Sequence, residues 1–129
     1  MAFKPNQSDI VSTMPLVELP ATAEEAYTVG EALKLSGGAV TKCGATDTPL
    51  YICGQELTAA AGDSVRCWRV PGTMTFETTL AAAGTALKIG DKVTLHTDGA
   101  QVTATTASGV AEIVRMDGTA AGSPVTVRF

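Results

Sequence analysis

The clearest indication of the fold is the stretch Val29-Gly30-Glu31-Ala32-Leu33-Lys34-Leu35-Ser36, because a close counterpart follows sixty residues later. That counterpart is Ile89-Gly90-Asp91-Lys92-Val93-Thr94-Leu95-His96. Both stretches have the order apolar residue, glycine, acid, any residue, apolar residue, polar residue, leucine. The register continues downstream, where Gly38-Ala39-Val40-Thr41 corresponds to Gly99-Ala100 and, after one extra residue, Val102-Thr103, and Ala60-Ala61-Gly62 to Ala120-Ala121-Gly122. The sequence therefore predicts two repeats of about 40 residues, 29–70 and 89–129.

Each repeat is expected to consist of short β-strands. Apolar and polar residues alternate, with the period of a strand that buries one face, in 65–70, 74–78, 93–96 and 125–129. Gly37-Gly38 and Asp98-Gly99 are turn dipeptides that tolerate positive φ. Two units that cannot each bury a sheet face should pack against one another. We therefore expect residues 27–129 to form a single, mainly β domain, a compact β barrel or sandwich (β-tulip-like) with pseudo-twofold symmetry.

Residues 1–26 differ in character and predict an extended N-terminal arm with little regular structure of its own. Pro5, Pro15 and Pro20 remove backbone donors and interrupt strands and helices, and only 22–26 could make one helical turn, capped by Thr22. Such an arm is either a disordered tail or a segment that orders on a partner. Its apolar residues exceed what a solvated tail needs and favour partner binding through Phe3, Ile10, Val11, Met14, Leu16 and Val17.

The single tryptophan has two interpretations. Trp68 lies between Arg66 and Arg69 in an alternating segment. If the face with Arg66 and Trp68 points outward, the two form a second candidate partner-binding site, because Trp and Arg dominate interface energetics. The alternative is that Trp68 packs over one end of the β body.

Composition and charge exclude several classes of protein. Hydrophobic residues make up 45% of the 129 residues and charged residues 17%, so the chain can bury a core by itself. The formal charge is −4 and the basic residues are scattered, which argues against a nucleic-acid partner. The sequence contains neither a membrane-spanning apolar run nor a secretory signal. We expect a protein that is made in the cytosol and stays there unless lysis or assembly carries it elsewhere.

The residues that could take part in catalysis or in metal binding lead us to predict that the chain is not an enzyme and binds neither a metal nor a cofactor. His96 is the only histidine, and no nucleophile motif accompanies it. Cys43, Cys53 and Cys67 lack the spacing of a zinc site and are expected to be reduced thiols facing the core. Glu31 and Asp91 occupy matching repeat positions, which favours a structural role in which each side chain caps the amides of a turn.

The order of several short blocks resembles capsid decoration (cement or head-stabilising) proteins of tailed phages. The blocks are 27–35, Pro49-Leu50-Tyr51-Ile52-Cys53, Phe76-Glu77-Thr78 and 88–95, and the resemblance covers residues 27–129. It implies a small β protein, made in the cytoplasm of the host bacterium, that binds the major capsid protein on the outside of the head between capsomers and stabilises the shell. Such proteins also contact copies of themselves, often as trimers. The implied location is the surface of the virion.

Two other functions stay open. The chain could be another structural virion component, such as part of a tail tube, a spike or the base of a head fibre, since these also use glycine-punctuated β modules. It could also be a small ligand-binding or hydrolytic β barrel, which would require a polar pocket around His96 and carboxylates.

Overall fold

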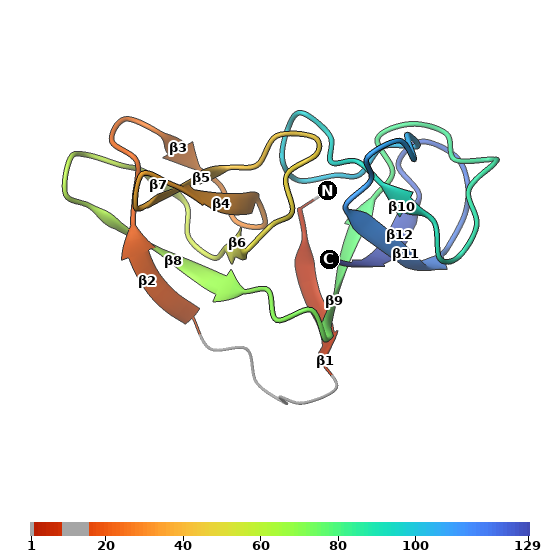
Figure 1. The fold of residues 1–129 in the computed structure, drawn as a ribbon, viewed down its shortest axis with the longest axis horizontal. Coiled ribbons are helices and arrows are strands. Elements are labelled where there is room, and N and C mark those ends of the chain that lie inside the picture. The colour runs from red at the N-terminus through yellow and green to blue at the C-terminus, as the bar shows by residue number, and fades with distance from the viewer. Residues whose placement is uncertain (1, 9–15) are drawn as a thin grey trace.

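The chain folds into two β lobes that lie side by side (Figure 1). The computed structural model describes residues 2–8 and 16–129, and within these residues it contains strands and turns but no helix. The mainly β fold that the alternation predicts is therefore confirmed. The strands are β1 (Lys4–Ser8), β2 (Leu16–Pro20), β3 (Ala26–Tyr27), β4 (Ala32–Ser36), β5 (Ala39–Lys42), β6 (Tyr51–Cys53), β7 (Leu57–Thr58), β8 (Ser64–Arg69), β9 (Met74–Thr79), β10 (Lys92–Val93), β11 (Ala111–Met116) and β12 (Pro124–Arg128).

Each lobe is built on one antiparallel sheet. The first lobe, residues 16–70, has the strand order β2-β8-β6-β4-β5, and the small sheet β3-β7 packs over one face of it. The second lobe, residues 2–8 and 71–129, has the order β1-β9-β12-β11-β10. Neither sheet closes into a barrel. Single bridges, Ala21 to Val40 and Leu80 to Val102, bring the two ends of each sheet toward one another without forming a ladder.

The backbone hydrogen bonds reproduce the internal repeat. Gly30 donates its N–H to the Cys53 carbonyl at 2.7 Å, and Gly90 donates to the Ile113 carbonyl at 2.8 Å. The strand order β2-β8-β6-β4 of the first lobe equals the order β9-β12-β11-β10 of the second. The correspondence therefore begins at β2 and β9, upstream of the repeat boundaries that the sequence indicates.

The two repeated acids cap the turns that lead into their strands. The Thr28 N–H donates to Glu31 Oε1 at 2.9 Å, and the Lys88 N–H donates to Asp91 Oδ2 at 2.9 Å. Desolvation raises the pKa of Glu31 above its ordinary value. The predicted capping role of both carboxylates is confirmed, and each is occupied with its own turn rather than with a site.

A shared core joins the lobes. The larger of two buried clusters takes Ala32, Cys43 and Ile52 from the first lobe and is otherwise made of second-lobe residues, among them Phe3 and Phe76. The smaller cluster lies inside the first lobe, between its sheet and the β3-β7 pair. Backbone hydrogen bonds also cross between the lobes, from Ala32 N–H to the Gly99 carbonyl at 2.7 Å and from Leu95 N–H to the Ala45 carbonyl at 2.9 Å.

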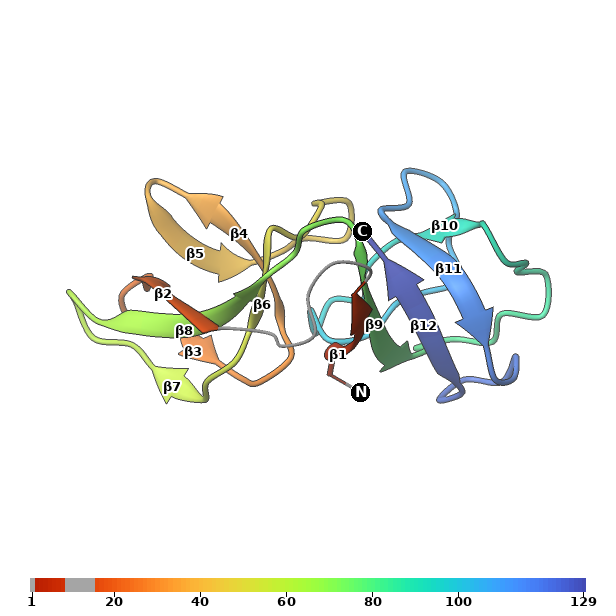
Figure 2. The same cartoon turned by 90° about the horizontal axis from the view of Figure 1, so that it is seen from below.

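The N-terminal segment corrects the predicted arm. β1 pairs with β9 in the second lobe and β2 pairs with β8 in the first, so the described parts of residues 1–26 are strands of the two sheets (Figure 2). Both are edge strands, where Pro5 and Pro20 are tolerated because one side of the backbone has no ladder to maintain. The expectation of little regular structure is therefore wrong for residues 4–8 and 16–20.

The helical turn expected at 22–26 is also absent. Glu24 has φ of 67°, which does not fit a right-handed helix. Thr22 Oγ1 does not cap a helix but donates to the Val40 carbonyl at 3.0 Å. Glu25 instead accepts hydrogen bonds from Thr41 and Lys42 of β5, so a tertiary contact engages the carboxylate that the capping box would need.

The three cysteines are free and buried, which confirms the expectation of reduced thiols in the core. Burial raises the pKa of Cys43 from 9.0 to about 12 and that of Cys67 likewise to about 12. A thiol that stays protonated in the folded state, while the same thiol ionises in the unfolded chain, stabilises the protein below the unfolded pKa. That contribution is lost as pH rises toward the folded pKa.

We therefore predict that the free energy of unfolding falls between about pH 9 and pH 10, with a slope that rises toward about 1.4 kcal/mol per pH unit for each of these two thiols. Urea denaturation at a series of pH values measures this slope. The double variant Cys43→Ala, Cys67→Ala is the control and should have a flatter profile. A wild-type free energy that does not change over this range would contradict the burial of the two thiols.

Candidate protein-binding edge

Four of the predicted partner-binding residues lie on β2 and β8, with Leu16, Arg66 and Trp68 on one face of the sheet and Val17 on the other. The two strands pair so that Leu16 is opposite Trp68, Val17 opposite Cys67 and Glu18 opposite Arg66. The structure places the fifth, Phe3, elsewhere, with 1% of its surface exposed in the larger core. Ile10, Val11 and Met14 lie outside the described residues. Phe3 is thus corrected from a candidate partner contact to a core residue.

The exposed apolar part of this edge is Leu16. Residues opposite each other in an antiparallel pair share a face, so Leu16 lies beside Trp68. Trp68 is half-buried and packs against the larger core, as the alternative interpretation of this residue predicts, whereas 43% of Leu16 is exposed. A Cβ at Gly54 would lie 2.6 Å from Leu16 Cδ2, so the glycine leaves the space that Leu16 occupies. Leu16 therefore presents exposed apolar surface at the outer edge of the first-lobe sheet.

An exposed ion pair lies next to Leu16. Glu18 Oε1 and Arg66 Nε are 3.6 Å apart, and their side chains are 68% and 60% exposed. Solvent screens such a pair, so it contributes little to stability. Each charge is therefore available to a partner at small energetic cost.

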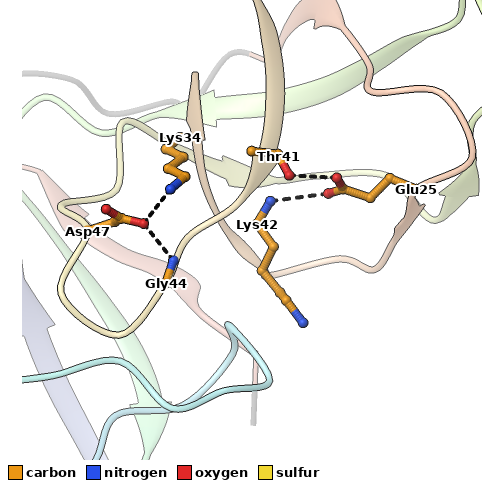
Figure 3. Close-up of polar contacts among 6 residues, drawn as sticks. All are labelled: Glu25, Lys34, Thr41, Lys42, Gly44 and Asp47. Carbon is orange, nitrogen blue, oxygen red and sulfur yellow. Dashed lines mark hydrogen bonds and ion pairs between the residues drawn. The ribbon is translucent and has the colours of Figure 1, made fainter. Parts of the chain in front are cut away.

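The opposite edge of the same sheet is closed by side chains. The backbone N–H of Lys42 on β5 donates to Glu25 Oε2 at 3.1 Å, and Thr41 Oγ1 donates to Glu25 Oε1 at 2.6 Å (Figure 3). The hydroxyls of Tyr27 and Thr22 both donate to the Val40 carbonyl. Burial raises the pKa of Tyr27, so the phenol remains a donor. Polar groups of β5 that face away from β4 are thus satisfied within the chain.

The Asp47 carboxylate near β4 also has a structural role. Asp47 Oδ2 accepts hydrogen bonds from Lys34 Nζ at 2.7 Å and from the Gly44 N–H at 2.7 Å (Figure 3). The hydrogen bond from Lys34 lowers the pKa of Asp47, and the same contact raises the pKa of Lys34. This arrangement fixes the 43–47 turn onto β4 through Asp47 Oδ2.

His96 is half-buried in a turn, where its carbonyl accepts the Gly99 N–H at 2.9 Å. A partly open hollow of about 250 Å³ lies elsewhere, beside β1 and β9, and is lined by Ala2, Lys4, Glu77, Thr78, Thr79 and Pro124. The described residues contain no group of three His, Cys, Asp or Glu that could hold a metal ion, and no helix long and apolar enough to cross a membrane.

Sequence reasoning did not single out Glu18, although it forms the centre of β2. The available signal was the pair Val17-Glu18, which matches Phe76-Glu77 fifty-nine residues later in an apolar-acid order. Two residues are too few to extend a repeat without the pairing partners. The pairing becomes visible only when β8 and β12 are aligned as equivalent strands.

Comparison with solved structures finds the same architecture in a phage protein. The crystal structure of the head fibre gp8.5 N base of bacteriophage phi29 matches with a TM-score of 0.60, covering 89% of this chain and 94% of that chain. The chain has the fold of this head-fibre base. The sequences are 20% identical, so the likeness concerns the fold. No protein-family model matches the chain, and no curated protein sequence is significantly similar to it.

Proposed function

We propose that this chain is a structural component of a tailed-phage virion, and that it forms a base that attaches a fibre to the outer surface of the head. The observation that carries the proposal is the similarity to the phi29 head-fibre base, which extends over nearly the whole of both chains. It favours the head-fibre alternative over a cement protein, because the matched structure is a fibre base.

The surface of the described residues fits attachment better than catalysis. The candidate edge offers an exposed leucine, an ion pair that is easily exchanged and a half-buried tryptophan. Interfaces are enriched in aromatic residues and arginine, and Trp and Arg are frequent among the few residues that contribute most of the binding energy. The partner that we propose is the major capsid protein, and contacts between copies of the chain would add avidity on a symmetric shell.

Binding to heads separates this proposal from a cement function. Purified chain is mixed with heads that lack it, and co-sedimentation and the melting temperature of the shell are measured. A fibre base should bind saturably and leave the melting temperature of the shell unchanged. Binding that raises the melting temperature would support the cement function, and no binding at saturating protein would contradict both.

The edge residue Arg66 provides a sharper prediction. Arg66→Ala should weaken binding to heads by about tenfold, as expected for an interface arginine. The matched control is Arg115→Ala, because Arg115 also belongs to an exposed ion pair, 3.1 Å from Asp117 in the second lobe. Both variants should keep the melting temperature of the free chain, since exposed pairs add little stability. Equal binding by the two variants would show that Arg66 does not contribute to the interface.

A further inference from the structure

We infer that the outer edge of β2 is a binding site for an extended segment of a capsid-shell protein, which adds to the first-lobe sheet as an antiparallel strand. The chain itself already contains the bound form of this arrangement, because β1 adds to β9 in the same way in the second lobe. The identity of the partner rests on the proposed function; the binding edge rests on the geometry below.

β2 and β9 are equivalent strands, residue by residue. β2 pairs with β8 and β9 pairs with β12 in the same direction and register over five successive pairs. The backbone continues identically after them, with Ala21 N–H donating to the Asp63 carbonyl at 2.9 Å and Leu80 N–H donating to the Ser123 carbonyl at 3.0 Å. By this register, Leu16, Val17, Glu18, Leu19 and Pro20 correspond to Thr75, Phe76, Glu77, Thr78 and Thr79.

In the second lobe the outer side of this strand is filled. β1 runs antiparallel to β9, with Lys4 opposite Glu77 and Pro5 opposite Phe76. Phe3, the residue before the strand, anchors it through an edge-to-face contact with Phe129, with ring centroids 5.3 Å apart. The second lobe thus accepts at this edge a basic residue opposite the repeated acid, with a buried apolar residue immediately before it.

In the first lobe the same side has no ladder partner along residues 16–20, and only Ala21, just beyond the strand, forms a single bridge there, to Val40. Among residues 2–8 and 16–129, β8 is the only strand that pairs with β2. The Ala21 N–H to Asp63 bond sets the phase of the ladder, because antiparallel residues point alternately toward and away from the partner strand. Leu19 and Val17 therefore bond to β8, whereas the N–H and C=O of Leu16 and Glu18 point outward. Unpaired groups of this kind are a template for another strand.

The residues along the β2 edge indicate which kind of segment can pair with it. β1 is engaged with β9 and is not available to the β2 edge, so we assign the segment that fills this edge to another protein. It should place a basic residue opposite Glu18, as Lys4 is opposite Glu77, and an apolar residue immediately before it. Glu18 can accept this partner because its pair with Arg66 is exposed and 3.6 Å long. Opposite charges facing each other across two strands stabilise the pairing.

Glu18→Pro tests the site through the backbone. Proline removes the one outward N–H at the centre of β2 and leaves the bonds of Val17 and Leu19 to β8 intact, as is typical of proline on edge strands. We expect about tenfold weaker binding to isolated heads, since a ladder bond and its neighbours are lost. Glu18→Ala, which keeps the N–H and removes only the charge, should weaken binding less.

Hydrogen exchange of the unmodified chain gives a second readout. The amides of Leu16 and Glu18 should exchange quickly in the free protein and become protected on heads. Loss of binding in Glu18→Pro with an unchanged melting temperature, together with this protection, supports the site. Equal binding by Glu18→Pro and wild type, or no protection of residues 16–20, overturns it and leaves the proposed function standing.

Two further outcomes would also overturn the inference. If wild type does not bind heads at saturation, the proposed function fails and the shell segment fails with it. If the free chain forms dimers that Glu18→Pro abolishes, as measured by sedimentation velocity, then the β2 edge pairs with a second copy and the inference of a shell-protein occupant is wrong.

Discussion

Phe3→Ala is expected to lower the free energy of unfolding by about 3–5 kcal/mol, which is a large part of the stability of a domain of this size. Phe3 is 1% exposed and packs against Phe129 in the larger core. Its backbone N–H donates to the Gly30 carbonyl at 2.9 Å, so the residue also fastens β1 to the first lobe. Truncation leaves a cavity where the two lobes meet, and the surrounding backbone can relax only partly.

Urea or thermal denaturation of the purified variant measures this effect. Leu16→Ala is the control, because Leu16 is also an N-terminal apolar residue but 43% exposed, and its truncation should cost about 1 kcal/mol or less. Similar losses in both variants would mean that Phe3 is not a core residue. A stable Phe3→Ala protein that no longer binds heads would show that Phe3 is a partner-binding residue after all.

The second large effect is expected at Gly30, for which the repeat supplies a matched control. Gly30 and Gly90 occupy equivalent turns, with φ of +90° and +96°. Alanine is strained by about 1–3 kcal/mol at such a φ in either place. A Cβ at Gly90 meets nothing within 4 Å, whereas a Cβ at Gly30 would lie 2.1 Å from Ala2 Cβ and 3.0 Å from the Phe3 nitrogen.

Gly30→Ala should therefore destabilise the protein by about 1–3 kcal/mol more than Gly90→Ala, since the added methyl group displaces backbone that holds β1 in place. Chemical denaturation of the two variants side by side gives the difference. Hydrogen exchange should show faster exchange in residues 4–8 of Gly30→Ala and no change there in Gly90→Ala. Equal destabilisation would show that the approach of residue 2 to this turn is not tight in solution.

Those parts of the fold that depend on local chemistry could be predicted from the sequence. The turn glycines at 37, 38 and 99 have positive φ, and Glu31 and Asp91 cap their turns. These features follow from residue type and from spacing within a few positions. The repeat was visible for the same reason, because glycine and acid recur in a fixed order around each turn.

The parts that depend on distant pairing could not be predicted. β1 and β2 pair with β9 and β8, strands that are far away in sequence, and neither segment carries a strong strand pattern of its own. Edge strands tolerate proline and need only one buried face, so Pro5 and Pro20 were misleading indicators. The predicted strand at 93–96 is likewise reduced to β10 and a single bridge at Leu95, because the hairpin equivalent to β4-β5 is irregular in the second lobe.

The candidate site was predicted in part. Leu16, Val17, Arg66 and Trp68 were selected by residue type alone, and the pairing of β2 with β8 brings them together. Glu18 was not selected, because a single acid between apolar residues does not indicate a binding site. Its role is suggested only by the structure, in which the equivalent residue, Glu77, lies opposite Lys4. The open side of β2 is a property of the sheet and has no signature in the sequence.

The position of the chain in phage particles tests most directly whether it forms a base on the head surface. Cryo-electron microscopy of particles assembled with the chain, compared with particles assembled without it, gives a difference map. We predict density on the outer surface of the head that fits the two lobes, with β2 toward the shell. Density in the tail, inside the shell, or no difference at all would contradict a base on the head surface.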